Sequence, residues 1–387
     1  MSNLYTNKLK GKNIGIVFGT FAPAHLGHYN TIIRAKREND GCVVVVSGRK
    51  GDRGDQVGLS LQKRFRYMRE LFADEENVYV TYVNEDEIPN YPDGWDAWYD
   101  LAYQAVLEAT DLLVPNQTWY VGEPEYKVEL EKRFVEYEEG EFVLATQRVK
   151  LMDRSVLPIS GTQVRENPLK YWNYIARPFR RHFSNNILIT GTASTGKTTL
   201  IRDLARSFGS PFTEEYARQY EEESNIRDEE LTANDFNYLA SGMFAANKEA
   251  IQSPANNGLM FADSNVLTTK FYSRYYLTEE EHSKLTPIYD MMLEKEKWAM
   301  ILIIPPVTKY VNDNFRDMSY SSDSERWKMH EMLMEELEKA GLMDKVILLD
   351  AKPKDKKEDP QGLQARYEQA RTLVKDFAKD KYNIDLI

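Results

Sequence analysis

The chain has 387 residues, 42% of them hydrophobic and 29% charged, which is enough for two domains with separate cores. Its formal net charge of −11 argues against a broad basic surface for nucleic acid, and its single cysteine, Cys42, excludes an internal disulfide and a cysteine-based zinc site. No apolar run approaches the roughly 20 residues of a membrane-spanning helix, and the N-terminus lacks the apolar core of a signal peptide. We therefore expect a cytoplasmic protein that is not embedded in a membrane.

Short apolar runs alternate with amphipathic stretches along the first half of the chain. The amphipathic stretches at 61–71 and 95–108 have helical periodicity. Strands are expected at 13–18, 42–47, 78–82, 119–121 and 142–144. This alternation predicts an α/β domain with a mostly parallel sheet flanked by helices.

A loop rich in glycine and histidine follows the first expected strand, with the sequence Gly19-Thr20-Phe21-Ala22-Pro23-Ala24-His25-Leu26-Gly27-His28. Gly19 and Gly27 permit a tight backbone, and the loop leads into a helix whose free N–H groups attract an anion. We predict that Gly19, Thr20, Phe21 and Gly27 contact a nucleotide. His25 and His28 would bind its triphosphate and stabilise the transition state. The combined spacing disfavours the alternative, an exposed turn with incidental histidines, and it lacks a zinc-binding pattern.

Two segments of the first half are candidates for holding an acceptor molecule. Arg49 and Arg53 follow the second expected strand and could meet a phosphate, although a solvated loop is an equal alternative. Trp95 and Trp98 are three residues apart on one helix face, where an indole could stack on a cationic aromatic ring. Core packing is the competing interpretation of the two tryptophans.

A short basic stretch at 177–185 marks the expected domain boundary, giving domains at 1–182 and 183–387. Strands are expected beyond it at 187–190, 259–262, 300–304 and 346–349, which predicts a second parallel sheet. Between the first of these strands and a helical pattern at 199–208, the chain matches the phosphate-binding pattern G-x-x-x-x-G-K-[ST] in full.

This second loop predicts a site for ATP and Mg²⁺. Lys197 would reach the β- and γ-phosphates, while Thr198 and Asp263, which ends an apolar strand, would lie at Mg²⁺. The other residues expected to contact ATP are Gly191, Ser194, Thr195, Gly196 and Thr199.

Acidic and basic residues near this loop suggest phosphoryl transfer to a small molecule. Glu215-Tyr216 resembles the E-Y pair of nucleoside kinases, which favours Glu215 over Glu214 as the base that takes a proton from an attacking hydroxyl, with Tyr216 and Arg218 beside the substrate. Arg316, with Arg326 as a second candidate, could neutralise charge on the transferring phosphoryl group.

The glycine- and histidine-rich loop resembles the G-x-F-x-P-x-H-x-G-H motif of the nucleotidyltransferase superfamily. A later segment, Ile159-Ser160-Gly161-Thr162-Gln163-Val164-Arg165, is similar to the I-S-x-T-x-x-R motif of the same superfamily. The resemblance implies that Ser160, Thr162 and Arg165 hold the β- and γ-phosphates. It also implies that the first domain is a Rossmann-like adenylyltransferase.

The order of the two halves resembles NadR-type bifunctional proteins, over nearly the whole chain. Tyr171-Trp172, Glu215-Tyr216, Asp263-Ser264 and Thr268-Thr269 also fit this family. The resemblance implies that nicotinamide riboside is phosphorylated by ATP to nicotinamide mononucleotide, which then receives AMP from ATP to give NAD and pyrophosphate. It places the acceptor at Arg49, Arg53, Trp95 and Trp98.

Three departures from the family pattern qualify this hypothesis. The first expected strand begins near Asn13, which leaves no room for an N-terminal helix-turn-helix domain, so we expect no direct DNA binding. Asn265 replaces an acidic residue, and Asn312-Asp313-Asn314 replaces a usual D-D-G. An NAD-sensing regulator and another acceptor such as pantetheine phosphate remain alternatives, and a homo-oligomer or a functional link to a riboside transporter stays open.

Overall fold

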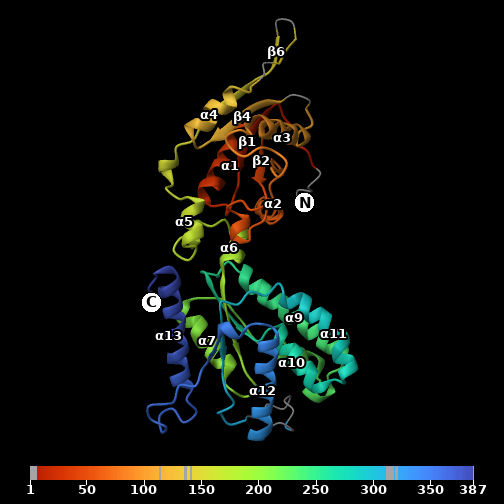
Figure 1. Cartoon of the computed structure of the whole chain (residues 1–387), viewed down its shortest axis with the longest axis vertical. Helices are drawn as coiled ribbons and strands as arrows, with labels where there is room; N and C mark the ends of the chain where they lie inside the picture. Colours follow the sequence, from red (N-terminus) through yellow and green to blue (C-terminus); the bar gives the residue numbers. More distant parts are fainter. Residues whose placement is uncertain are drawn as a thin grey trace. The chain divides into compact units, whose positions relative to one another are not determined.

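The computed structural model describes residues 7–112, 115–134, 137–139, 142–310, 318 and 321–386. The chain divides into two compact units, Met1–Phe183 and Ser184–Ile387 (Figure 1). Each unit contains a parallel five-stranded sheet flanked by helices, which confirms the predicted α/β class. No helix in the described ranges is both long and apolar enough to cross a membrane.

The sheet of the first unit has the strand order β3-β2-β1-β4-β7, and every neighbouring pair is parallel. Its strands are β1 (Asn13–Gly19), β2 (Gly41–Gly48), β3 (Val78–Asn84), β4 (Asn116–Val121) and β7 (Gln147–Leu151). The order of the strands reverses between β1 and β4. In an open α/β sheet, ligands bind at the carboxyl ends of the strands beside such a reversal.

Alternating residues of the buried strands in this unit supply two apolar cores, one on each face of the sheet. Val44 and Val46 pack towards α1 (Leu26–Glu38), α2 (Leu61–Leu71) and α6 (Arg177–Phe183). Val43 and Val45 pack on the opposite face, against α3 (Trp95–Glu108) and α4 (Pro124–Glu131). A strand that is buried on both faces explains the uninterrupted valine run.

The expectation that 142–144 forms a strand of this parallel sheet is wrong. These residues belong to β6 (Phe142–Ala145), which pairs in antiparallel fashion with β5 (Tyr137–Glu139) as a separate two-stranded sheet. The fifth position is taken by β7, an edge strand with the sequence QRVKL. Because an edge strand keeps polar side chains towards solvent, its apolar signal is weak.

The sheet of the second unit has the strand order β12-β11-β8-β10-β9, again entirely parallel. Its strands are β8 (Asn185–Thr190), β9 (Phe212–Thr213), β10 (Leu259–Asp263), β11 (Met300–Ile303) and β12 (Val346–Leu348). Of these five strands, β9 was not predicted from the sequence, because a strand of two residues is too short to show a periodic pattern. The central strand β8 leads directly into the predicted phosphate loop.

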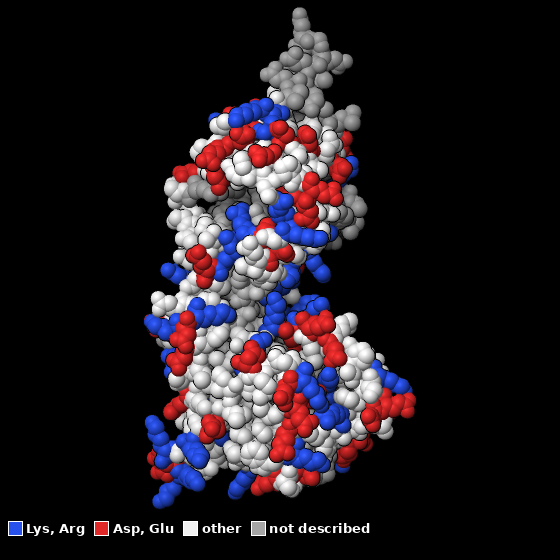
Figure 2. Space-filling view, viewed as in Figure 1, with Lys and Arg blue, Asp and Glu red and all other residues white. Residues whose placement is uncertain are grey.

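Helices cover both faces of this second sheet (Figure 1). The pair α7 (Lys197–Phe208) and α13 (Leu363–Tyr382) packs on one face with Ile187 and Ile189. Leu188 faces the other side, towards α10 (Val266–Tyr276) and α12 (Asp323–Lys339). A further apolar cluster joins α10 to α8 (Tyr216–Ser224), α9 (Ala233–Gln252) and α11 (Glu279–Leu293). Acidic and basic side chains are interspersed on the surface that Figure 2 shows for each unit.

Candidate nucleotide-binding sites

The two histidines of the glycine- and histidine-rich loop of the first unit accept hydrogen bonds from backbone N–H groups of that loop. Nδ1 of His25 accepts the Gly27 N–H at 3.2 Å, and Nδ1 of His28 accepts the His25 N–H at 3.3 Å. These reciprocal bonds cap α1, and the two rings lie 3.8 Å apart. Because both Nδ1 atoms accept backbone protons, each neutral imidazole carries its proton on Nε2. The loop therefore fixes the tautomer of both predicted phosphate-binding histidines.

Backbone geometry explains two of the residue choices in this loop. A Cβ atom on Gly27 would lie about 3.0 Å from the ring of His25, so a side chain there would disturb the cap. Phe21 is buried, has a φ of 47°, and its ring packs edge-on to His28. A non-glycine residue in this conformation is uncommon and marks a locally constrained backbone.

The second motif of this unit meets the first through Arg165. Ser160 caps α5 (Gly161–Glu166) by accepting the Gln163 N–H at 3.2 Å. The guanidinium of Arg165 donates to the carbonyl of Ala22 at 2.7 Å and to the hydroxyl of Thr162 at 3.0 Å. Burial, and then the nearby charge of Arg53, lower the pKa of Arg165. Two helix N-termini and two guanidinium groups are thus brought to one place, which suits a polyanionic ligand.

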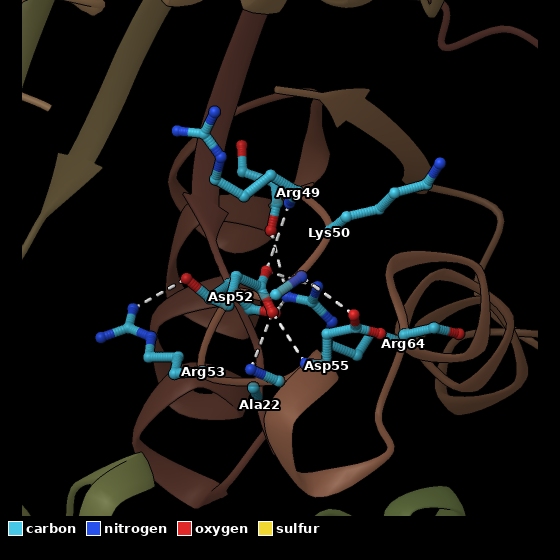
Figure 3. A network of polar contacts seen from close by, with 12 residues as sticks. Ala22, Arg49, Lys50, Asp52, Arg53, Asp55 and Arg64 are labelled. Atoms are coloured by element: carbon cyan, nitrogen blue, oxygen red, sulfur yellow. Dashed lines mark hydrogen bonds and ion pairs between the residues drawn. The ribbon is translucent and has the colours of Figure 1, made fainter. Parts of the chain in front are cut away.

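A buried ion pair that sequence analysis missed supports these loops (Figure 3). Arg64 is fully buried and donates to Thr20 O at 2.7 Å, to Ser47 O at 3.2 Å and to Asp52 Oδ2 at 2.6 Å. A Cβ atom on Gly48 would lie 2.4 Å from the Arg64 guanidinium, which explains the glycine. The signal was present in the sequence, because Arg64 lies on the apolar face of α2 with Phe65 and Met68.

Hydrogen bonds to Asp52 hold the loop that carries Arg49 and Arg53, the two arginines predicted to bind the phosphate of the acceptor molecule. Its carboxylate accepts the backbone N–H groups of Arg49, Gly54 and Asp55 as well as the Arg64 guanidinium. Arg53 donates to the hydroxyl of Thr20 at 2.7 Å, whereas the Arg49 side chain points away from the Arg64–Asp52 pair (Figure 3). A role for either arginine at an acceptor phosphate stays a prediction.

The two tryptophans predicted to contact the acceptor molecule are buried on one face of the sheet. Trp95 is 9% exposed and Trp98 is 8% exposed, and their rings lie 5.5 Å apart and nearly perpendicular. Trp98 Nε1 donates to the hydroxyl of Ser47 at 3.0 Å. Both rings therefore contribute to the core, as the packing alternative expects, and stacking on a ligand stays a prediction.

The phosphate loop of the second unit joins β8 to α7. Gly191 has a φ of 149° and a Cβ atom there would lie 2.6 Å from the carbonyl of Ile304, while Gly196 has a φ of 89° at the N-cap of α7. Lys197 is buried, with Nζ donating to Thr192 O at 3.2 Å, and the hydroxyl of Thr195 donates to the same carbonyl at 3.0 Å. A cavity of about 560 Å³ adjoins the loop and is lined by Gly196, Thr199, Leu200, Asp203, Leu363 and Tyr367.

The acidic residue at the end of β10 lies against this loop. The hydroxyl of Thr198 donates to Asp263 Oδ2 at 2.7 Å. Burial raises the pKa of Asp263 to about 6, Lys197 acts in the opposite direction, and the negative charge of Glu215 raises it further. A hydroxyl and a carboxylate side by side are oxygen ligands of the kind that Mg²⁺ takes together with substrate phosphates, so the residues fit this ion.

The two neighbouring glutamates after β9 have different surroundings. Glu214 is exposed and bonded to Arg202 Nε at 2.7 Å, which lowers its pKa. Glu215 is the N-cap residue of α8 and acts electrostatically on Asp263. Tyr216 packs on Gly242, where a Cβ atom would collide with its ring, and Arg218 lies 3.6 Å from Glu222. Glu215 therefore contributes to the electrostatic surroundings of Asp263, whereas Glu214 is paired with Arg202.

Neither candidate for a charge-neutralising arginine is shown at the phosphate loop. Arg316, with the Asn312-Asp313-Asn314 segment, lies outside the described residues. Arg326 is 1% exposed and donates to the carbonyl of Thr308, whose hydroxyl donates to Ser194 O. Arg326 is therefore connected to the phosphate loop through Thr308. Asn265 is structural too: it caps α10 and donates to Glu296 at 2.7 Å.

These two sites define a two-domain α/β protein in which a unit with a Rossmann-like parallel sheet precedes a P-loop kinase-like unit. A family model described as an AAA domain matches residues 186–356. Two crystal structures match along the whole chain. A NadR protein in complex with NR is 41% identical with a TM-score of 0.85, covering 98% of this chain and 99% of its own. A NadR protein in complex with NAD and AMP-PNP is 42% identical with a TM-score of 0.81 and the same coverage.

Two curated relatives are described as trifunctional NAD biosynthesis/regulator proteins NadR. The one from Salmonella typhimurium (strain LT2) is 28% identical over 84% of this chain and 77% of its own length. The one from Escherichia coli (strain K12) is 28% identical over 86% of this chain and 78% of its own length. The chain belongs to the NadR family.

Proposed function

We propose that this protein carries out two successive steps of NAD synthesis. The second unit would transfer the γ-phosphoryl group of ATP to nicotinamide riboside. The first unit would then transfer AMP from ATP to the resulting mononucleotide, giving NAD and pyrophosphate. The observation that carries this proposal is that distant motif residues meet within each unit, Arg165 with Ala22 and Asp263 with Thr198. The NadR structures named with NR and with NAD and AMP-PNP support the choice of substrates.

In the first unit, a phosphate oxygen of the mononucleotide would attack the α-phosphorus of ATP. The bond from the α-phosphorus to the bridging oxygen breaks, and pyrophosphate leaves. Nε2–H of His25 and His28, the Arg165 guanidinium and the N-termini of α1 and α5 would stabilise the charge on the triphosphate. Arg49 or Arg53 would hold the acceptor phosphate, and Trp95 or Trp98 would lie at its cationic ring. These groups place the reactants and need no covalent intermediate.

In the second unit, the ribose hydroxyl would attack the γ-phosphorus while the bond to the β-phosphate oxygen breaks. Glu215 would accept the hydroxyl proton, and Lys197 would neutralise charge on the β- and γ-phosphates. Thr198 and Asp263 would hold Mg²⁺, which when bound supplies further neutralisation of phosphate charge. The cavity beside Gly196 and Thr199 would take the base of ATP.

The test uses purified protein and one variant of each site. Wild-type protein should convert nicotinamide riboside to its mononucleotide, and the mononucleotide to NAD, each with Mg·ATP. Lys197→Ala should abolish the first conversion and spare the second, and His28→Ala should do the reverse. Nicotinic acid mononucleotide and pantetheine phosphate serve as competing acceptors. If wild-type protein forms no NAD, the adenylyl transfer proposed for the first unit is wrong. If it binds NAD but converts neither substrate, an NAD-sensing function is favoured.

A further inference from the structure

Asn247 is a buried polar side chain that the proposed reaction does not use. It lies in α9 and is 3% exposed. Its Oδ1 accepts the hydroxyl of Thr213 at 2.7 Å, and its Nδ2 donates to the carbonyl of Ser264 at 3.3 Å. A buried amide is costly unless both of its polar ends are bonded, and here both are.

The two partners of Asn247 stand at the ends of the strands that lead to the acidic residues. Thr213 is the last residue of β9, two positions before Glu215, and Ser264 directly follows Asp263 at the end of β10. The described pairing between these strands ends at Ala262 and Thr213. The side chain of Asn247 therefore links the last paired residue of β9 to the residue that follows β10, at the end of the strand pairing.

The turn after Asp263 has a constrained backbone. Ser264 has a φ of 78°, a conformation that a residue with a side chain adopts only when its surroundings enforce it. Its carbonyl is held by Asn247, and the next residue, Asn265, is fixed by its bond to the half-buried Glu296. The orientation of Asp263 thus depends on a turn that Asn247 and Glu296 hold from two sides.

We infer that Asn247 is a positioning residue of the kinase site, which sets the separation of the Glu215 and Asp263 carboxylates by tying together the ends of β9 and β10. The inference rests on the function proposed for the second unit. Asn247 bonds Thr213, which lies two residues before Glu215, and Ser264, which directly follows Asp263, so it links the two segments that carry these carboxylates. One carboxylate is assigned to the attacking hydroxyl and the other to Mg²⁺, so their separation decides whether both reach their targets.

The experiment compares two buried asparagines that flank opposite ends of β10. Asn247→Leu removes both bonds of the tie. Asn256→Leu is the matched control: Asn256 is also 3% exposed and bonds Ser184, Ile251 and Gly258, next to the amino end of β10. Thermal melts of each variant report whether the second unit is folded, and NAD formation by the first unit of the same polypeptide serves to compare the amounts of chain.

We expect Asn247→Leu to lower kcat for riboside phosphorylation by about 10- to 100-fold, the usual effect of removing a group that orients a ligand or a catalytic side chain. KM for ATP should change by less than about twofold, because the phosphate loop is not touched. Asn256→Leu should leave kcat near the wild-type value. Equal kcat values for the two leucine variants would overturn the inference.

A pH readout separates positioning from a general packing effect. In Asn247→Asp, the introduced carboxyl group keeps the acceptor for Thr213 but loses the donor to Ser264 while it is ionised. Burial of this position favours the protonated form of the introduced carboxyl group, which regains that donor. The ratio of variant to wild-type kcat should therefore rise as the pH is lowered from about 8 to about 6. A ratio that does not change with pH would overturn the inference.

Thr213 gives a milder test should the leucine variant fail to fold. Thr213→Val removes one bond of the tie and should lower kcat, whereas Thr213→Ser retains the hydroxyl and should restore it. An unchanged kcat in Thr213→Val would overturn the inference. Wild-type protein that phosphorylates no riboside would overturn the proposed kinase function and this inference with it, so the two failures are distinguishable.

Discussion

The hydroxyl of Thr198 donates to Asp263 Oδ2 at 2.7 Å and so joins the phosphate loop to the end of β10. Burial raises the pKa of Asp263 to about 6, whereas an aspartate in an unfolded chain titrates near 3.8. A carboxyl group with a raised folded pKa favours folding below about pH 3.8, and this contribution is lost as the pH rises through about 6. The ionised form that would hold Mg²⁺ therefore works against the stability of the fold.

The first prediction follows from this conflict. Asp263→Asn should lower kcat for riboside phosphorylation by at least about 100-fold, because Asn supplies no charge at the phosphates. It should also raise Tm at pH 8 by several degrees, and less at pH 5, where the wild-type carboxyl is protonated in the folded state. Riboside assays and thermal melts at both pH values check this. A variant less stable than wild type at pH 8 would contradict the assignment of the shift to burial.

The second prediction separates the two neighbouring glutamates. Glu215→Gln should lower kcat for riboside phosphorylation by about 10²- to 10⁴-fold, the contribution of a general base. Glu214→Gln is the matched control: it loses only an exposed ion pair with Arg202, worth about 1 kcal/mol or less, and should keep most of the activity. Steady-state kinetics with varied riboside measure both. The reverse ranking of the two variants would make Glu214 the base.

The third prediction concerns the buried Arg64. A lysine ammonium cannot reach Thr20, Ser47 and Asp52 together, so Arg64→Lys should destabilise the first unit by about 1–3 kcal/mol. NAD formation should fall by about 10- to 100-fold, because the loops that carry Thr20 and Arg53 lose their common support. Riboside phosphorylation by the same chain should be unaffected.

A suitable control for this experiment is Arg66→Lys, because Arg66 is exposed on the same helix. Rates of NAD formation and denaturant melts of the two variants give the comparison. If both variants form NAD at the wild-type rate, Arg64 does not support the site.

The fourth prediction concerns Glu221, which is 6% exposed in α8. Burial, followed by the neighbouring Asp228, raises the pKa of Glu221 to about 9. Its contribution to folding is therefore present below about pH 4.5 and is lost as the pH rises through about 9. Glu221→Gln should be more stable than wild type, by a margin in Tm that grows between pH 5 and pH 9. The exposed Glu223→Gln should show no such trend, and a constant margin for Glu221→Gln would contradict the raised pKa.

Local sequence was sufficient for most of the fold and for the position of both phosphate loops. The helices α2 and α3 coincide with their predicted ranges, because each shows helical periodicity with well-defined ends. The phosphate loops were recognisable because close approach of backbone to phosphate restricts which residues fit at fixed spacings. The strands β7 and β9 were not recognisable, one because it is a polar edge strand and the other because it has two residues.

Tertiary structure alone decided how the sites are held together. Arg165 reaches Ala22, Arg64 reaches two loops and the end of β2, and Asn247 joins Thr213 to Ser264, all between segments that are separate in the sequence. Such bonds leave no local pattern, because they depend on which strand ends become neighbours after the sheet has formed. The sequence determined where the two predicted phosphate loops lie along the chain, through short-range backbone and side-chain constraints. The fold determined which buried side chains hold those loops and the neighbouring strand ends together, because these are contacts between distant segments.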